Sequence, residues 1–203
     1  MPVALLFDEN FLLATSKKMP WADVQAMIDD VRQHPDAYVM GSPGRGGAVH
    51  LAVYSAIKGL GLQCRYVPER SNADVLKAIA GGTTHFHAAS ANEVQRFDLK
   101  PLLVLADHRS TAYPDVPTAG ELGYAIPVFS NYMGLYAPKG ISPEIVTRLS
   151  DTMGEIAASA EFQKMADQMG CTVRYMPHAE FLAFYDQQYA LYKKLMAEVL
   201  KGS

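Results

Sequence analysis

The residues best suited to bind a ligand lie in one glycine-rich segment, Gly41-Ser42-Pro43-Gly44-Arg45-Gly46-Gly47. It joins an expected strand at residues 38–40 to an expected helix, whose free N–H groups and dipole would attract an anion. Glycine lets a ligand approach the backbone closely. Ser42 offers a hydroxyl, and Arg45 could bind a carboxylate by donating two hydrogen bonds. The alternatives are a plain tight turn and an Arg45 side chain in solvent. We expect an anion or carboxylate site.

The same segment does not follow the patterns of nucleotide-binding loops. No Gly-Lys-Ser/Thr follows it, as a phosphate-binding loop requires. After Gly44 and Gly46, Val49 stands where the dinucleotide fingerprint has its third glycine. These departures disfavour a nucleotide ligand.

The histidines and cysteines do not form a pattern typical of catalysis. His85-Phe86-His87 would place two imidazoles on one face of a strand, a spacing that some metal sites use. No Asp, Glu or Cys in that stretch completes a ligand set, and His50 comes from elsewhere in the chain. Cys64 and Cys171 lack a local cue for activation, and there is no Gly-x-Ser-x-Gly elbow. We predict no catalytic residue, no metal and no cofactor.

The composition is that of a globular protein with a sizeable core. The chain has 203 residues, of which 49% are hydrophobic and 19% are charged, and this excludes disorder as the main state. Its 18 Lys and Arg residues against 21 Asp and Glu residues give a net charge of -3. That balance argues against sequence-independent nucleic-acid binding, which needs a basic surplus. No apolar run approaches the roughly 18 residues that span a bilayer.

Short strands and helices alternate along the first part of the chain, which predicts an α/β fold with a parallel or mixed sheet covered by helices on both faces. The expected strands are residues 3–7, 11–15, 38–40, 64–67, 84–88, 102–106, 129–137 and 172–175. The expected helices are the segment that Pro20 opens and Pro35 closes, then residues 48–60, 71–80, 92–96, 143–159, 161–169 and 179–200.

The elements divide into two parts at a proline-rich stretch around Pro114, Pro117 and Pro127. Residues 1–125 would form a complete α/β lobe that carries the glycine-rich segment. Residues 126–203 offer only two strands for three helices. We therefore expect these residues not to form a complete unit by themselves.

Three segments together resemble one protein family. The segment from Gly41 to Ala52 is similar to that family's Gly-Ser-x-Gly-x-Gly-x-x-x-His-Leu-Ala pattern. Residues 105–118, which end in Tyr-Pro-Asp-Val-Pro-Thr, resemble its Leu-Pro-Asp-Val-Pro-Thr signature, and residues 134–140 resemble its Gly-Leu-x-Ala-Pro-x-Gly crossover. In this order and at these separations they resemble the Bug-type solute receptors of tripartite tricarboxylate transporters, which are two-lobed periplasmic binding proteins.

The resemblance implies a solute-binding protein in which two lobes close over a small organic acid. Residues 126–203 would then be the crossover strand and helices of the other, incomplete lobe. Backbone N–H groups, small hydroxyl side chains and waters from two loops, one in each lobe, hold the carboxylate in that family. The implied partners are a small organic carboxylate and membrane transporter subunits, and the implied location is the periplasm. The N-terminal half of the first lobe and a signal peptide are absent from this chain, so we expect a truncated form. A homodimer would cover the incomplete lobe.

The expected ligand-binding residues combine the glycine-rich segment with the other loops of the fold. They are Ser42, Gly44, Arg45, Gly46, Gly47, Ala48, His50, Ser71, His87, Ser90 and Asn131. The chain departs from the family at residues 69–72, where Tyr-Lys-Gly-Gly is usual, and at residues 83–90, where Gln-Val-Asp is common. An acidic group that would engage an amino group is replaced there, so no particular substrate is implied.

Two other functions stay open at this point. An α/β enzyme could act on an acidic or phosphorylated small molecule, with His50, His85 or His87 as the general acid or base. A structural or interaction role would keep the scaffold and lose the binding.

Overall fold

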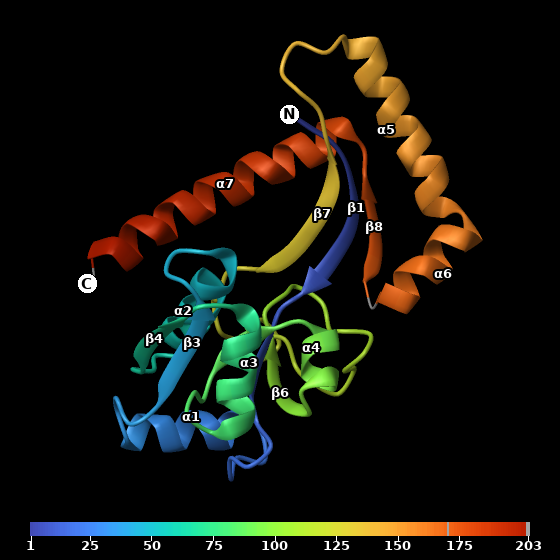
Figure 1. The fold of residues 1–203 in the computed structure, drawn as a ribbon. Helices are drawn as coiled ribbons and strands as arrows, with labels where there is room; N and C mark the ends of the chain where they lie inside the picture. Colours follow the sequence, from blue (N-terminus) through green and yellow to red (C-terminus); the bar gives the residue numbers. More distant parts are fainter. Residues whose placement is uncertain (170, 202–203) are drawn as a thin grey trace. The chain divides into compact units, whose positions relative to one another are not determined.

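A computed structural model of the chain describes residues 1–169 and 171–201 (Figure 1). The chain divides into two compact units. The central unit is Asn10–Ser130, and the terminal unit combines Met1–Glu9 with Asn131–Ser203. The two units are described separately below.

The central unit contains a mixed set of strand pairs. Strand β2 (Leu12–Ser16) runs antiparallel to both β5 (His87–Ala89) and β6 (Leu99–Val104). Strand β3 (Val39–Pro43) runs parallel to β4 (Arg65–Glu69). A parallel bridge between Met40 and Phe86 joins β3 to the residues just before β5. The α/β class with a parallel or mixed sheet is confirmed, and the parallel pairing places the glycine-rich segment beside β4.

The helices of the central unit are α1 (Val24–Gln33), α2 (Ala48–Gly59), α3 (Asn72–Gly81) and α4 (Ala91–Arg96), of which α2, α3 and α4 pack on the strands. The side chain of Asp23 caps α1 by accepting a hydrogen bond of 2.8 Å from the Ala26 N–H. Pro20 therefore does not open this helix, because the capping carboxylate defines a later start. The expected cap of α3 is confirmed, since the Ser71 hydroxyl accepts from the Asp74 N–H.

One core cluster of the central unit lies between β2, β6 and helices α3 and α4. Apolar positions three and four apart give α3 one buried face. The buried members of this core cluster are Leu12, Ala14, Val75, Leu76, Ile79, Ala89, Val94, Leu99, Val104 and Ala106. This packing fixes the strands whose ends carry the loops of the candidate site.

The terminal unit is built on a three-stranded sheet with β1 (Pro2–Asn10) in the middle, between β7 (Ser130–Tyr136) and β8 (Thr172–Met176) (Figure 1). Its helices are α5 (Pro143–Ala158), α6 (Ala160–Met169) and α7 (His178–Lys201). A side chain at Gly134 would place its Cβ only 2.5 Å from the Ala4 carbonyl oxygen, so this glycine permits the close approach of β7 to β1.

The structure differs from the sequence analysis at the N-terminus. β1 continues through Asp8 to Asn10, whereas the expected strand ended at residue 7. The buried Asp8 carboxylate pairs with Arg174 of β8, so an acidic residue stays within the strand. As a result residues 1–9 belong to the terminal unit rather than to the expected lobe 1–125, and the second boundary lies at 130 rather than 125.

Candidate functional site

The glycine-rich segment connects β3 to the first turn of α2. Gly44 and Gly46 have φ angles of 79° and 84°, in the left-handed region that favours glycine. Gly47 is the N-cap of α2 and makes no side-chain capping bond. Gly47 and Ala48 are both exposed. The first N–H groups of a helix have no partner within it, so this end of α2 faces solvent with its backbone donors.

Two hydroxyl groups converge on one carbonyl of this segment. The buried Ser42 hydroxyl donates to the Gly44 carbonyl oxygen at 2.8 Å, and the Tyr66 hydroxyl donates to the same oxygen at 2.6 Å. The Gly44 N–H donates to the Glu69 carbonyl at 3.2 Å. Ser42, expected to face the ligand, therefore uses its hydroxyl proton inside the loop.

His50 is bonded to the same segment. Its Nδ1 accepts a hydrogen bond of 2.8 Å from the Gly46 N–H, and its ring stacks on Tyr66 with centroids 4.0 Å apart. Burial, and secondly the nearby Arg45 charge, lower the pKa of His50 to about 4. The imidazole is therefore neutral at neutral pH, with its acceptor nitrogen already engaged.

Tyr66, which the sequence analysis missed, is central to this cluster. The guanidinium of the exposed Arg45 lies 5.4 Å from the centroid of the Tyr66 ring. The sequence predicted a strand at residues 64–67 but not its register, which pairs Met40 with Tyr66. The sequence feature that could have identified Tyr66 is its place as an aromatic residue in a strand expected beside the glycine-rich segment.

Ser71 and Ser90 cap helices α3 and α4. The Ser71 hydroxyl donates to the Asp74 carboxylate at 2.8 Å. Ser90 and Glu93 form a reciprocal capping box, in which the Ser90 N–H donates to Glu93 at 2.8 Å. The Asn72 amide donates to the other Glu93 oxygen and so links the two helix starts. Both expected ligand hydroxyls thus have a capping role in the structure.

His87 and His85 both contact the backbone of β3. The fully buried His87 has its Nδ1 3.0 Å from the Gly41 carbonyl oxygen, so this nitrogen carries the proton. Its Nε2 has no hydrogen-bond partner among the described residues. The His85 Nδ1 accepts from the Val39 N–H at 3.0 Å. Burial lowers the pKa of both imidazoles. These bonds attach both imidazoles to the backbone of β3.

Asn131 lies in the terminal unit, at its boundary with the central unit. Its amide donates to the Glu9 carboxylate at 3.3 Å. This bond joins the two chain segments that make up the terminal unit. The other expected site residues belong to the central unit. Within that unit the glycine-rich segment and His50 both contact Tyr66. His87 contacts the first residue of the segment, Gly41.

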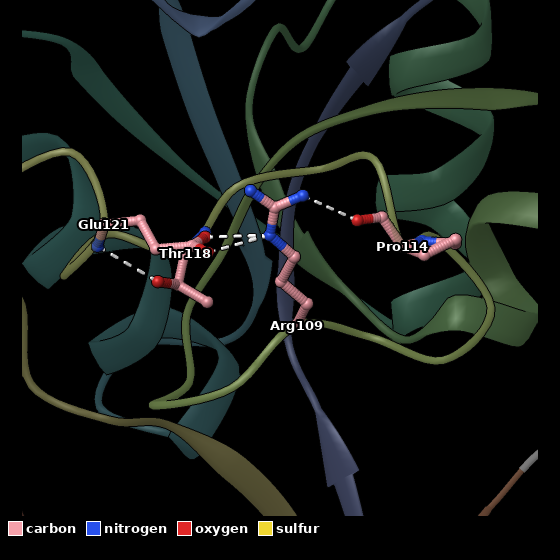
Figure 2. Close-up of polar contacts among 4 residues, drawn as sticks. All are labelled: Arg109, Pro114, Thr118 and Glu121. Atoms are coloured by element: carbon pink, nitrogen blue, oxygen red, sulfur yellow. Dashed lines mark hydrogen bonds and ion pairs between the residues drawn. The ribbon is translucent and has the colours of Figure 1, made fainter.

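In the central unit, hydrogen bonds and an ion pair stabilise the loop that contains the proline-rich motif near residue 114 (Figure 2). The Arg109 Nε lies 2.9 and 3.0 Å from the two Glu121 carboxylate oxygens, and its Nη1 donates to the Pro114 carbonyl at 2.8 Å. Glu121 also accepts from the Thr118 N–H, and this bond, followed by Arg109, lowers the pKa of its carboxyl. These contacts account for the motif without a ligand.

Within residues 1–169 and 171–201, no group of three or more His, Cys, Asp or Glu side chains could hold a metal ion. Over the same residues, the helices are too short or too polar to cross a bilayer.

The chain matches the family model described as "Tripartite tricarboxylate transporter family receptor" over residues 1–200. It is 25% identical over 176 residues to the protein BugT of Bordetella pertussis, covering 85% of this chain and 54% of BugT. The chain thus spans about half the length of the curated relatives it matches.

Solved structures share its fold. A TctC solute binding protein from Polaromonas is 25% identical and matches with a TM-score of 0.82 over 97% of this chain and 69% of its own. An R. palustris protein solved with adipate has a TM-score of 0.82 at 22% identity, covering 98% and 68% of the two chains. MatC from Rhodopseudomonas palustris, with bound malate, gives 0.72 at 23% identity, covering 98% and 67%.

These matches confirm the resemblance seen in the sequence and the expectation that the chain is not an enzyme, because the matching proteins are receptors and binding proteins. With a family model that covers residues 1–200, this chain belongs to the tripartite tricarboxylate transporter receptor family and is a Bug-type receptor chain.

Proposed function

We propose that the chain binds a small organic carboxylate in the periplasm and delivers it to the membrane subunits of a tripartite tricarboxylate-type transporter. The observation that carries the proposal is the exposed start of α2, where left-handed glycines present the backbone without a capping side chain. A helix start of this kind favours an anion through its N–H groups and its dipole.

The charges around this helix start support an anionic ligand. His50 is neutral at neutral pH, and the Arg45 guanidinium is the cationic group next to it. Both oxygens of Glu93 are engaged by Asn72 and by the Ser90 backbone. The Arg45 cation beside the exposed helix start supports recognition of a carboxylate.

A thermal-shift screen tests the proposal, with acetate, adipate, malate and citrate as the probes. Adipamide, which has the length of adipate without its charges, is the matched control. Ligand at 100 times its Kd stabilises a protein by about 2.7 kcal/mol, which is easily seen as a higher Tm. We expect at least one carboxylate to raise the Tm while adipamide leaves it unchanged. No shift with any of the four acids would contradict the proposal and favour a structural role.

Delivery to membrane subunits and a homodimer stay predictions. Light scattering at several protein concentrations tests the dimer, which requires a mass of twice the 22.2 kDa chain.

A further inference from the structure

One peptide group of the glycine-rich segment is held by groups from two strands. The carbonyl oxygen of Gly44 accepts from Ser42 of β3 at 2.8 Å and from Tyr66 of β4 at 2.6 Å. The two hydroxyl oxygens are 3.0 Å apart. No described peptide bond is cis, so the Arg45 N–H points away from the Gly44 oxygen and hence away from both hydroxyls.

This orientation matters for an anion because a rotated peptide would exchange the positions of its oxygen and its N–H. The partial negative charge of the oxygen would then lie on the side that the N–H now occupies. Gly44 has a φ of 79° and open space where a Cβ would lie, so its backbone keeps the conformational freedom of glycine. The two hydroxyls restrain this peptide at its carbonyl oxygen.

We infer that Tyr66 is a positioning residue that fixes the orientation of the peptide between Gly44 and Arg45 and thereby the anion affinity of the loop, a role that rests on the proposed function. Its ring stacks on His50, whose Nδ1 holds the Gly46 N–H. One side chain therefore restrains two consecutive peptide groups, one through its hydroxyl and one through its partner ring. Burial raises the pKa of Tyr66, so its hydroxyl remains a donor at neutral pH.

The substitution Tyr66→Phe removes the hydroxyl and keeps the ring that stacks on His50. Tyr54→Phe is the matched control, because the Tyr54 ring lies 6.2 Å from the same His50 ring while its face lies under the Lys58 ammonium group. Backbone amide signals of Arg45 and Gly46 are compared by ¹⁵N NMR. We expect both signals to move in Y66F and to stay in place in Y54F. Calorimetric titration with adipate, malate and citrate should show affinity lower by about tenfold in Y66F alone.

Ser42→Ala provides a second variant that removes the other hydroxyl from the same oxygen, and we expect it to move the same two amide signals. Unchanged Arg45 and Gly46 signals in Y66F would overturn the positioning role. Changed signals with wild-type affinity would overturn its link to binding. If the wild-type chain binds none of the three acids, the proposed function fails, and the amide signals still decide whether Tyr66 orients the peptide.

Discussion

His50 combines a buried ring with a backbone hydrogen bond that only its neutral form can accept. The Gly46 N–H donates to Nδ1, and burial lowers the pKa of the imidazole from 6.5 to about 4. The unfolded chain therefore takes up this proton at a higher pH than the folded chain. The contribution of neutral His50 to stability is complete above pH 6.5 and is lost as the pH falls toward 4.

This linkage predicts the pH dependence of one substitution. His50→Asn keeps an oxygen acceptor for the Gly46 N–H and removes the titrating group. We expect the free energy of unfolding of the wild-type chain to fall more steeply than that of H50N between pH 6.5 and 4.5, measured by urea denaturation. Equal slopes for the two proteins would show that His50 does not titrate with the lowered pKa.

The left-handed glycines give a second test at single residues. Gly44 and Gly123 both have a φ of 79° and open space where an alanine Cβ would lie. An alanine would therefore have the same backbone strain at each position. Each substitution should lower the free energy of unfolding by about 1 kcal/mol. Only Gly44→Ala should also weaken carboxylate binding in calorimetry, because Gly123 lies outside the glycine-rich segment. Equal affinities of G44A and G123A would contradict the proposed site.

Strand β1 includes a buried acidic residue, Asp8, although an acidic residue disfavours a strand in its local sequence. Asp8 is 4% exposed, within a strand that pairs antiparallel with β8 and brings Arg174 to it. Replacing Arg174 leaves a buried carboxylate without its cation, so Arg174→Met should cost about 3 kcal/mol of unfolding free energy.

A surface pair supplies the comparison for that prediction. Lys17 and Asp98 also form an ion pair, with side chains 58% and 81% exposed. Lys17→Met should therefore cost less than about 1 kcal/mol, because exposed ion pairs contribute little. Similar losses for R174M and K17M in urea denaturation would refute the assigned importance of the buried pair.

The sequence predicted those elements whose signals are local. The Ser71 cap, the buried face of α3 and the glycine-rich segment all depend on residues within a few positions of one another. The extension of β1 and the place of Tyr66 depend on partners that are distant in sequence, namely Arg174 and the register between β3 and β4. Hydrophobic periodicity and turn residues do not specify such distant pairings, so the sequence alone did not predict them.

The sequence predicted that the glycine-rich segment joins a strand to a helix, but it did not predict the hydrogen bonds of the nearby hydroxyl side chains. Ser42, Ser71 and Ser90 were expected to face a ligand because they are small hydroxyl residues near strand ends. In the structure each satisfies a backbone group of the protein itself. A hydroxyl near a helix start serves as a cap as readily as a ligand contact, and sequence spacing does not distinguish the two.

At the scale of the whole molecule, the chain crosses between its two units twice, at residues 9–10 and 130–131. The central unit has its own core cluster, so residues 10–130 should fold cooperatively as a separate polypeptide. Circular dichroism during urea denaturation checks this, and a gradual, non-cooperative loss of signal would contradict it. Deleting residues 1–9 should instead disrupt the terminal unit, whose sheet loses its middle strand.

The two ends of the central unit meet in a backbone hydrogen bond, from the Phe11 N–H to the Phe129 carbonyl at 3.4 Å. In chain order the central unit is therefore an insertion with adjoining ends, placed between the first strand of the terminal unit and the rest of it. A segment of this kind can be transplanted. Exchanging residues 10–130 for the corresponding segment of a related receptor requires only two neighbouring junctions, and it would carry the entire glycine-rich loop, with its supporting tyrosine, into a new host.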